Sequence, residues 1–419
     1  MKYTLINCYS DNNKGDSGII LSTIELLKEF ENDAEIIGIS TYNASDPCFI
    51  TEHEFLKKYI KVLPSIFGEL NIGNNKGFIA KNARFVFDSF RLLMILVIPF
   101  KLKPLIKFFF LESELSTLKH IENSDYIISK GGSFICNEKG LREKLGLIRF
   151  LFIFLVCFKF NKKVVILSQS IGPIYGNASR RYVNLILKKC HWIVFREELC
   201  ISKYSYLEFN TERTSIINDI AFHLQTNQIV SPLKFQNDRI NIGFTIKEVD
   251  LHLRKAYENM IIDGIKHCID KLGANVFIFP HVTIDNDVDV SFDIYRKVPD
   301  YYKNSISVFS DDYNANELKK MYSNMNFFIG TRLHSTIFAI GENVPSIGIT
   351  YHGTKSEGIF KNYGLGKYVI NDYNSSDLLV AIDDLILNHS KIKTIISDGN
   401  IRFKSKFFEI FEVIFRGEV

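Results

Sequence analysis

Two cations and a histidine stand close together after apolar runs in the C-terminal third of the sequence. The segment FFIGTRLHS, residues 327–335, breaks at Gly330 and then presents Arg332 and His334, and Lys355 follows the next apolar run. An arginine guanidinium can bind two oxygens of a carboxylate or phosphate at once, and a lysine adds a point charge. A histidine can donate or accept a proton near neutral pH. These residues therefore predict a site that binds a small anion and moves a proton.

Other polar residues and glycines also follow strand-like runs. Ligands of open parallel sheets bind outside the carboxyl ends of the strands, so these positions are further candidates. Each has a structural alternative: glycines suit tight turns, an Arg-Glu-Glu segment suits a solvated helix start, and a strand-end histidine, including His334, can simply satisfy neighbouring groups. The further candidates are Asn13, Gly15, Asp16, Gly131, Gly132, Gln169, Arg196, Glu197 and His281.

Strand-like and helical runs alternate along most of the chain. Short apolar runs such as YTLINCY, KKVVILSQS and NFFIG are separated by helical patterns, which predicts parallel sheets covered on both faces. The runs form two groups on either side of a polar segment at 223–238. We expect an α/β protein with two Rossmann-like domains, residues 1–225 and 239–395, facing a central cleft. A C-terminal helix, residues 396–419, would pack back across the hinge.

Composition excludes several classes of function. The 419 residues carry a formal net charge of +4, far from the concentrated basic charge of a nucleic-acid binder. The seven cysteines are scattered and include no CxxC pair, so we expect reduced thiols in a cytoplasmic protein and no metal site. The N-terminus does not have the pattern of a signal peptide, and no apolar run is long enough for a membrane-spanning helix.

Seven motifs occur in one order along nearly the whole chain. They are NKGD (13–16), ISKGGSF (128–134), SQSIGP (168–173), FREEL (195–199), NDIAF (218–222), FPHV (279–282) and a long block at 330–358 that contains RLHS, Pro345, Tyr351 and Lys355. This set resembles the polysaccharide pyruvyl transferase family. Two positions depart from the pattern: Ser133 stands where a third glycine is common, and Asn218 where a proline is usual.

The resemblance implies a fold like that of the two-domain GT-B glycosyltransferases. It implies transfer of a pyruvyl group from phosphoenolpyruvate to two hydroxyls of a sugar, with phosphate as the second product and no cofactor. The donor would be bound by Arg332, His334, Arg196 and Lys355. We expect His334 to be the general acid and Asp16 the general base, with Glu197 as the second choice of base. Asn13, Gly15, Gly131, Gly132 and Gln169 are the expected acceptor-binding residues.

Two apolar stretches edged with basic residues, 91–112 and 145–163, have two interpretations. They are either buried helices of the first domain or a surface that docks on a membrane. Docking would suit a lipid-linked sugar acceptor at the inner face of the plasma membrane. Two other functions remain open: a nucleotide-sugar glycosyltransferase of the same architecture, and a non-catalytic sugar-binding member of a polysaccharide-assembly complex.

Overall fold

The chain divides into two compact units. The computed structural model describes residues 1–67, 90–91, 93–98, 107–227, 229–231, 239–350 and 354–417. The first unit holds residues 1–11, 27–195 and 201–215, and the second unit holds 12–26, 196–200 and 216–419. Unlike the domain of residues 1–225 expected from the sequence, the first unit therefore lacks three segments, residues 12–26, 196–200 and 216–225.

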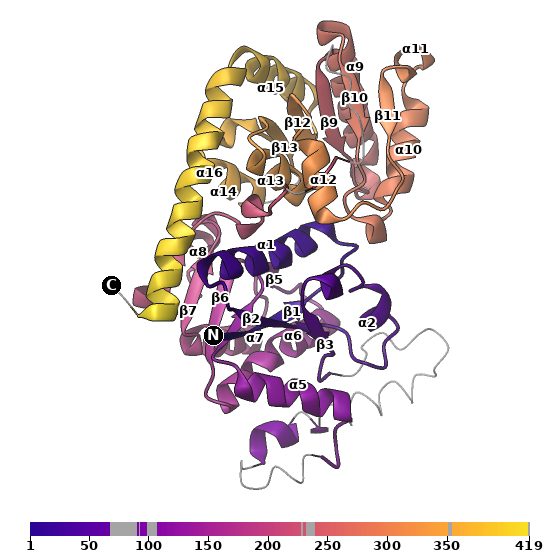
Figure 1. Ribbon diagram of the computed structural model, residues 1–419. Coiled ribbons are helices and arrows are strands. Elements are labelled where there is room, and N and C mark those ends of the chain that lie inside the picture. The colour runs from indigo at the N-terminus through magenta and orange to yellow at the C-terminus, as the bar shows by residue number, and fades with distance from the viewer. Residues whose placement is uncertain are drawn as a thin grey trace, which may run out of the picture. The chain divides into compact units, whose positions relative to one another are not determined.

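The first unit is built on a parallel sheet. Its described strands run in the order β3-β2-β1-β4-β6-β7-β8, and β5 pairs with β6 (Figure 1). The strands are β1 (Lys2–Cys8), β2 (Glu35–Ser40), β3 (Lys61–Leu63), β4 (Tyr126–Ser129), β5 (Gly132–Ile135), β6 (Lys163–Ile171), β7 (Trp192–Phe195) and β8 (Thr214–Ile216). The helices in this half of the chain include α1 (Lys14–Phe30), α2 (Cys48–Thr51), α5 (Glu112–Asn123), α6 (Leu141–Lys159), α7 (Asn177–Lys189), α8 (Leu199–Lys203) and the short turns Leu56–Lys58, Thr211–Arg213 and Ile220–His223.

The second unit has a parallel sheet in the order β11-β10-β9-β12-β13-β14, the strand order of a Rossmann fold with β9 as its first strand. The strands are β9 (Asn241–Thr245), β10 (Asn275–Ile278), β11 (Ile306–Val308), β12 (Phe327–Gly330), β13 (Ser346–Ile349) and β14 (Val369–Ile370). The helices are α9 (Leu251–Leu272), α10 (Asp287–Lys297), α11 (Asp300–Lys303), α12 (Ala315–Tyr322), α13 (Leu333–Gly341), α14 (Thr354–Asn362), α15 (Ser375–Leu387), α16 (His389–Phe411) and the short helices Thr283–Asp285, Gly366–Tyr368 and Glu412–Arg416.

The central strands are apolar because helices cover both faces of each sheet. All of β12 is buried, as is β6 after its first residue. Their registers are in phase with their neighbours: Ile329 of β12 lies beside Phe244 of β9, and Val165 of β6 beside Ile128 of β4. The prediction of two parallel Rossmann-like sheets is confirmed. The expected path of the C-terminal helix across a hinge stays a prediction; within the second unit, α16 contacts α13 and α15.

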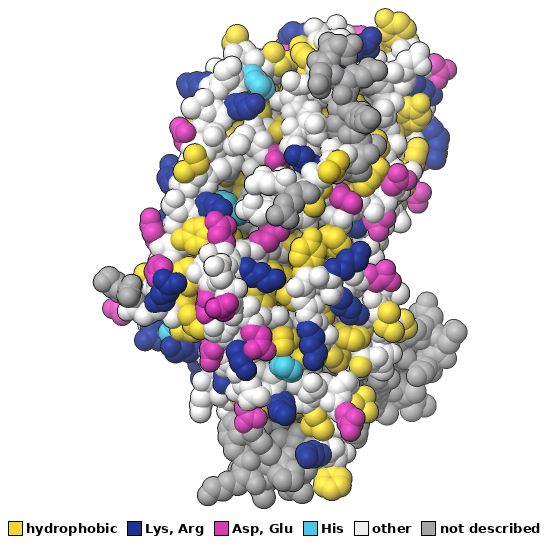
Figure 2. Space-filling view, in the orientation of Figure 1, with side chains coloured by type: hydrophobic (Ala, Val, Ile, Leu, Met, Phe, Trp, Pro, Cys, Tyr) yellow, Lys and Arg dark blue, Asp and Glu magenta, His cyan; other side chains and the backbone are white. Residues whose placement is uncertain are grey.

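The second apolar-basic stretch is a core helix. Helix α6 buries Leu151, Phe154, Val156 and Cys157 and contacts β6 and α7 of its own unit. Part of the first stretch, residues 92 and 99–106, lies outside the described residues. No helix in the described ranges is both long and apolar enough to cross a membrane. On the face drawn in Figure 2, basic side chains are interspersed with acidic and uncharged ones.

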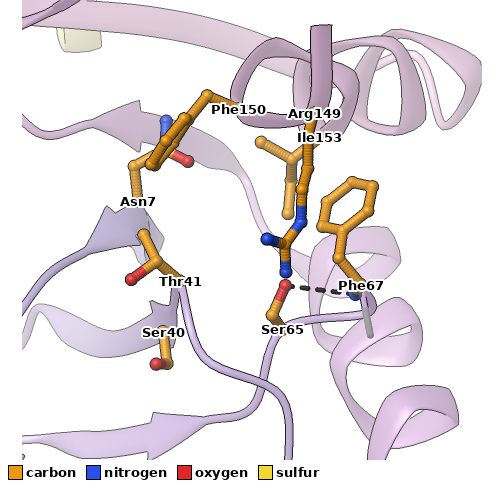
Figure 3. A pocket seen from close by; sticks show the side chains of 8 residues that line it. All are labelled: Asn7, Ser40, Thr41, Ser65, Phe67, Arg149, Phe150 and Ile153. Carbon is orange, nitrogen blue, oxygen red and sulfur yellow. Dashed lines mark hydrogen bonds between the residues drawn. The ribbon is translucent and has the colours of Figure 1, made fainter. Parts of the chain in front are cut away.

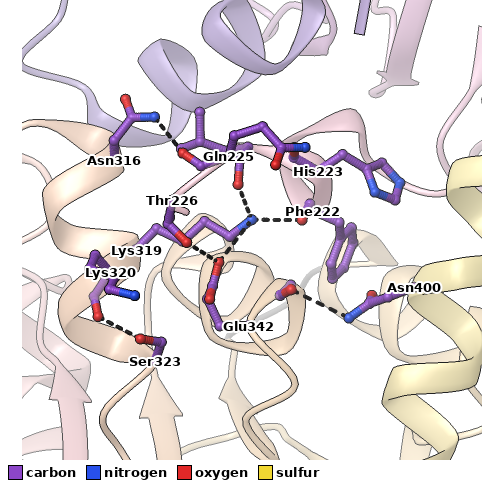
Figure 4. A network of polar contacts seen from close by, with 12 residues as sticks. Phe222, His223, Gln225, Thr226, Asn316, Lys319, Lys320, Ser323, Glu342 and Asn400 are labelled. Atoms are coloured by element: carbon purple, nitrogen blue, oxygen red, sulfur yellow. Dashed lines mark hydrogen bonds and ion pairs between the residues drawn. The ribbon is translucent and has the colours of Figure 1, made fainter. Parts of the chain in front are cut away.

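The beginning of the segment expected to be a linker is bound to the second unit. Lys319 of α12 is buried and donates hydrogen bonds of 2.7 Å to the carbonyl oxygens of Phe222 and Leu224 (Figure 4). Asn316 donates to the Gln225 carbonyl oxygen at 2.8 Å. These bonds hold the chain that follows the NDIAF motif in place, and so they support the position of that motif in the site.

Candidate active site

Arg332 and His334 lie in the turn and the first helical residues between β12 and α13. Gly330 ends the strand where a Cβ atom would lie 2.5 Å from Thr336 and 2.7 Å from Ser335, so a larger residue would collide with the first turn of α13. Arg332 is the N-cap residue of α13, and the Ser335 hydroxyl donates to its carbonyl oxygen at 2.6 Å. The same hydroxyl lies 2.6 Å from Thr245 at the end of β9. The Arg332–His334 loop is therefore fixed to the neighbouring strand.

Arg332 is held by two carboxylates. Its Nη2 and Nε atoms bind the two oxygens of Asp287 at 2.5 and 3.1 Å, and its Nη1 donates to Asp285 at 3.0 Å. Asp287 is fully buried, whereas the Asp285 side chain is 52% exposed. Burial raises the pKa of Asp287, although the contact with Arg332 opposes that shift. Asp287 thus orients the guanidinium of Arg332. Among the contacts that the structure describes, the Nη1 atom of Arg332 pairs only with the exposed carboxylate of Asp285.

His334 lies between a helix backbone and a buried ion pair. A Cβ atom on Gly15 of α1 would lie 2.4 Å from the His334 Nδ1 atom, so the imidazole packs directly on the backbone of α1. On the other edge of the ring, Nε2 is 3.8 Å from an Asp219 carboxylate oxygen. The same oxygen accepts a hydrogen bond of 2.7 Å from Arg196, and both Arg196 and Asp219 are buried. Asp219 therefore links the arginine of the FREEL motif to the histidine of the RLHS motif.

A pocket opens beside Arg332 where the strand order of the second sheet reverses. It has a volume of about 780 Å³ and lies at the carboxyl ends of β9 and β12, the usual ligand position of such sheets. Lys247 lines it as a second cation, and burial and the nearby charge of Arg332 lower the pKa of this lysine. Helix α9, with Asp250 at its N-cap, begins at the pocket wall. The pocket thus combines two cations, three carboxylates (Glu248, Asp250 and Asp285) and the start of a long helix.

The second unit contains all four predicted donor-binding residues and five of the other candidates. Asn13 caps α1, since its Oδ1 accepts from the Asp16 backbone N–H at 3.2 Å and its amide donates to the Asp16 carboxylate at 2.8 Å. Asn13 also forms an antiparallel bridge with Val282, next to His281. Lys355 is the second residue of α14, after β13. Those that belong to this unit are Asn13, Gly15, Asp16, Arg196, Glu197, His281, Arg332, His334 and Lys355.

The three remaining acceptor candidates belong to the first unit. A side chain at Gly131 would lie 2.6 Å from two carbonyl oxygens of β6, and Gly132 has a φ of +117°, so local geometry accounts for both glycines. Gln169 is buried beside Gly132 in the sheet and donates to the Ser170 carbonyl oxygen at 2.7 Å. Their proposed contact with the acceptor stays a prediction.

Glu197 and His281 have clear structural surroundings. Glu197 is buried and accepts from the Cys200 backbone N–H at 2.8 Å, which caps α8. His281 is buried with Nδ1 3.1 Å from the Tyr322 hydroxyl, and burial together with the charges of His334 and Arg332 holds its pKa well below the usual value. Glu197 as the second choice of base stays a prediction, and its buried capping contact favours the structural alternative.

Three site residues were not among those expected from the sequence. Asp219 lies inside the NDIAF motif, Lys247 ends the β9 run, and Asp287 follows the FPHV motif by five residues. The motif itself could have indicated Asp219, because an aspartate within a matching segment is a natural partner for a motif arginine. Asp287 and Lys247 become recognisable only when the two strand ends are adjacent.

We expect Gly15→Ala to destabilise the protein by about 1–3 kcal/mol, because the new methyl group collides with His334. In a His334→Gly background the collision disappears, because the Cβ atom of His334 that would lie 2.7 Å from the new methyl group is removed with the ring. The same change should there be neutral or stabilising by up to about 1 kcal/mol, since alanine favours helix over glycine. Denaturant unfolding of the four proteins measures this reversal. Gly146→Ala, at a helical glycine of α6 with open space around it, is the control. Equal destabilisation in both backgrounds would contradict the contact.

Comparisons with known proteins agree with the motif pattern and the fold. A model of the family described as polysaccharide pyruvyl transferase matches residues 13–353. The amylovoran biosynthesis protein AmsJ of Erwinia amylovora is 22% identical, with 94% of each chain covered. HepE of Anabaena, solved with UDP and glucose, has a TM-score of 0.56 at 10% identity, covering 98% of this chain and 99% of that one. The UDP-GlcNAc 2-epimerase of Neisseria meningitidis, solved with UDP-GlcNAc, has a TM-score of 0.55 at 11% identity, with 98% and 99% covered. These structural likenesses confirm the GT-B-like fold, and they carry no more than the fold.

Proposed function

The chain belongs to the polysaccharide pyruvyl transferase family, and from this premise we propose that it transfers the pyruvyl group of phosphoenolpyruvate to two hydroxyls of one sugar. The products would be a cyclic ketal and phosphate. We propose an exopolysaccharide sugar as the acceptor, because the relative AmsJ is named for amylovoran biosynthesis. The observation that carries the proposal is the adjacency of Arg332, held at one corner by an exposed carboxylate, and His334, held between α1 and Asp219.

The donor would enter the pocket at Arg332 and Lys247. Exposed ion pairs contribute only about 0–1 kcal/mol, so an oxygen of the donor can replace Asp285 at Nη1 with little loss. Asp287 would meanwhile keep the guanidinium in place. Phosphoenolpyruvate carries a carboxylate and a phosphate, which matches two cations and a helix N-terminus. In this proposal Lys355 adds a further positive charge, and Arg196 acts through Asp219 on the position of His334.

In the proposed reaction, His334 donates a proton to the methylene carbon of the donor, which becomes a methyl group. The adjacent carbon becomes electrophilic, and one sugar hydroxyl adds to it while Asp16 accepts the hydroxyl proton. The bond from this carbon to the phosphate oxygen breaks, and the departing phosphate is stabilised by the cations. The second hydroxyl then closes the ketal and loses its proton, so the two hydroxyl protons balance the new methyl hydrogen and the proton on phosphate.

On the acceptor side, we propose Asn13, Gly15, Gly131, Gly132 and Gln169 as the residues nearest the sugar. The acceptor would be free or lipid-linked, and in the second case the enzyme would work at the inner face of the plasma membrane as a peripheral protein. No cofactor or metal is proposed, since proton transfer and charge stabilisation by side chains are sufficient for this chemistry.

Calorimetric titration with phosphoenolpyruvate, beside UDP and CMP, tests the donor. We expect binding of phosphoenolpyruvate alone, weakened about 10- to 100-fold in Arg332→Lys, because a charged hydrogen bond contributes about 1.5–3 kcal/mol. Lysine retains a positive charge opposite the buried Asp287, but it cannot bind two oxygens at once as the planar guanidinium does. Arg296→Lys, at an exposed ion pair on α10, is the matched control. Binding of a nucleotide instead would assign the chain to the glycosyltransferase alternative.

A further inference from the structure

A small cavity lies at the carboxyl ends of β1, β2 and β3 in the first unit, under helix α6 (Figure 3). The strand order of the first sheet reverses between β1 and β4, and the cavity lies on the β2 side of β1 at the same carboxyl edge. Ligands of open parallel sheets bind outside this edge. None of the residues expected to bind the acceptor lines this cavity. It is lined by Asn7, Ser40, Thr41, Ser65, Phe67, Arg149, Phe150 and Ile153.

Asn7 is the most unusual residue of this cavity. It has a φ of 63° at the end of β1, a left-handed conformation inside a strand, and only 7% of it is exposed. Its amide Nδ2 has no hydrogen-bond partner among the residues that the structure describes, and neither has the Thr41 hydroxyl. A buried donor without a partner destabilises the fold, and strained backbone often marks ligand sites. Both groups would be satisfied by oxygen atoms of a ligand.

The charge around the cavity favours an anion. Arg149 reaches from α6 toward the Ser65 hydroxyl, with Asn7 and Thr41 across from it (Figure 3). The Ser65 hydroxyl oxygen accepts from the Phe67 backbone N–H at 3.1 Å, which leaves the hydroxyl proton for another acceptor. None of the eight described lining residues is acidic. A guanidinium, an amide and two hydroxyls form a donor-rich wall, which suits a carboxylate or a phosphate.

The cavity is large enough for one small chemical group of a ligand, and too small for a whole sugar ring. Its volume is about 40 Å³, and one water needs roughly 10–15 Å³ on this measure, so it holds about three heavy atoms. A carboxylate has three heavy atoms, and a phosphate group has more. Phe150, 36% exposed, stands at the cavity and contacts the Phe134 ring at 6.1 Å, which provides an apolar surface for the rest of a sugar.

We propose that this cavity binds the carboxylate of an acidic sugar in the acceptor. The proposal rests on the proposed function only in calling that sugar the acceptor; binding itself requires no pyruvyl transfer. A uronic acid would place its carboxylate against Arg149, Asn7 and Thr41 and its ring on Phe150. The enzyme would then select acceptors with an acidic sugar. This acidic sugar would be either the one that receives the ketal or its direct neighbour.

Asn7→Asp tests this proposal, because it replaces a donor by a like charge with almost no change of shape, and aspartate tolerates the left-handed conformation. Asn161→Asp is the matched control, since Asn161 also has a positive φ, 53°, and is exposed in the same unit. The probes are methyl glucuronide, methyl glucoside and glucose 1-phosphate, with binding followed by ligand-observed NMR. We expect wild type to bind the glucuronide at least 10-fold tighter than the glucoside, and this preference to be lost in Asn7→Asp alone.

Each other outcome overturns the proposal. Equal binding of glucoside and glucuronide would remove the role of charge, and a preference for glucose 1-phosphate that Asn7→Asp abolishes would assign the cavity to phosphate. Glucuronide binding that survives Asn7→Asp would place the ligand elsewhere. If Asn7→Asp does not fold, as judged by circular dichroism, Arg149→Gln must remove the preference in its place. Phosphoenolpyruvate binding by the same variants is measured separately, so a failure of the donor assignment is recognised independently.

Discussion

Replacing Asp219 with alanine is expected to lower the free energy of unfolding by about 3–5 kcal/mol. The carboxylate is fully buried and pairs at 2.7 Å with Arg196, which is 1% exposed. Its loss breaks this buried ion pair by removing one partner, and the cost of such a change exceeds that of most single substitutions. It also removes the cap on the Ala221 backbone N–H, which Asp219 binds at 2.9 Å. Urea unfolding followed by fluorescence measures the loss.

The matched comparison is Asp293→Ala. Asp293 also pairs with an arginine, Arg296 at 2.5 Å, but it is 41% exposed, so its removal should cost about 0–1 kcal/mol. Asp219→Asn retains an acceptor for the cap and for Arg196 and should be intermediate. A cost for Asp219→Ala as small as that for Asp293→Ala would show that the buried pair does not hold this part of the second unit together.

His334→Ala is expected to lower turnover by about 10²- to 10⁴-fold, the range for removal of a general acid. Binding of phosphoenolpyruvate should stay within a few-fold of wild type, because the donor cations remain. Phosphate release in the presence of donor and acceptor measures turnover, and calorimetry measures binding. His334→Gln fills the same space over Gly15 without an acid, so it should be as inactive as the alanine variant.

His267→Ala serves as the control for this prediction. His267 pairs with Asp383 at 2.7 Å on α9 of the same unit, away from the residues assigned to the reaction, and its loss should leave turnover unchanged. Normal turnover in His334→Ala would exclude the histidine as the acid. Loss of donor binding together with turnover would make His334 a ligand of the phosphate instead.

The sheets could be predicted well from the sequence because each central strand is buried on both faces. Runs such as VVIL and FFIG have no polar face that could be exposed, so their place in a parallel sheet follows from their composition alone. Arg332 and His334 could be chosen as candidates because they directly follow a predicted strand, and the carboxyl ends of parallel strands meet at one edge of the sheet, where ligands bind.

The partners of these residues could not be predicted, because they depend on contacts between distant segments. Arg332 forms ion pairs with Asp285 and Asp287, so a bound anion would have to compete with these carboxylates for the guanidinium. The membership of residues 12–26 in the second unit was missed for the same reason. Helix α1 follows β1 directly, and adjacency in sequence predicted that it would stay with that strand's domain. Asn7 gave no signal either, since a strand-end asparagine is common.

The division of the chain has a consequence for translation and for domain exchange. Gly15 leaves the ribosome well before His334, so the surface of α1 that receives His334 and Phe338 stays uncovered while the second half of the chain is made. A fragment that begins at residue 216 would lack the wall behind His334 and the counter-charge of Asp219. A chimera of two relatives joined near residue 225 would therefore combine a histidine from one parent with the glycine and arginine of the other. Such hybrids need both early segments taken from the parent of the C-terminal half.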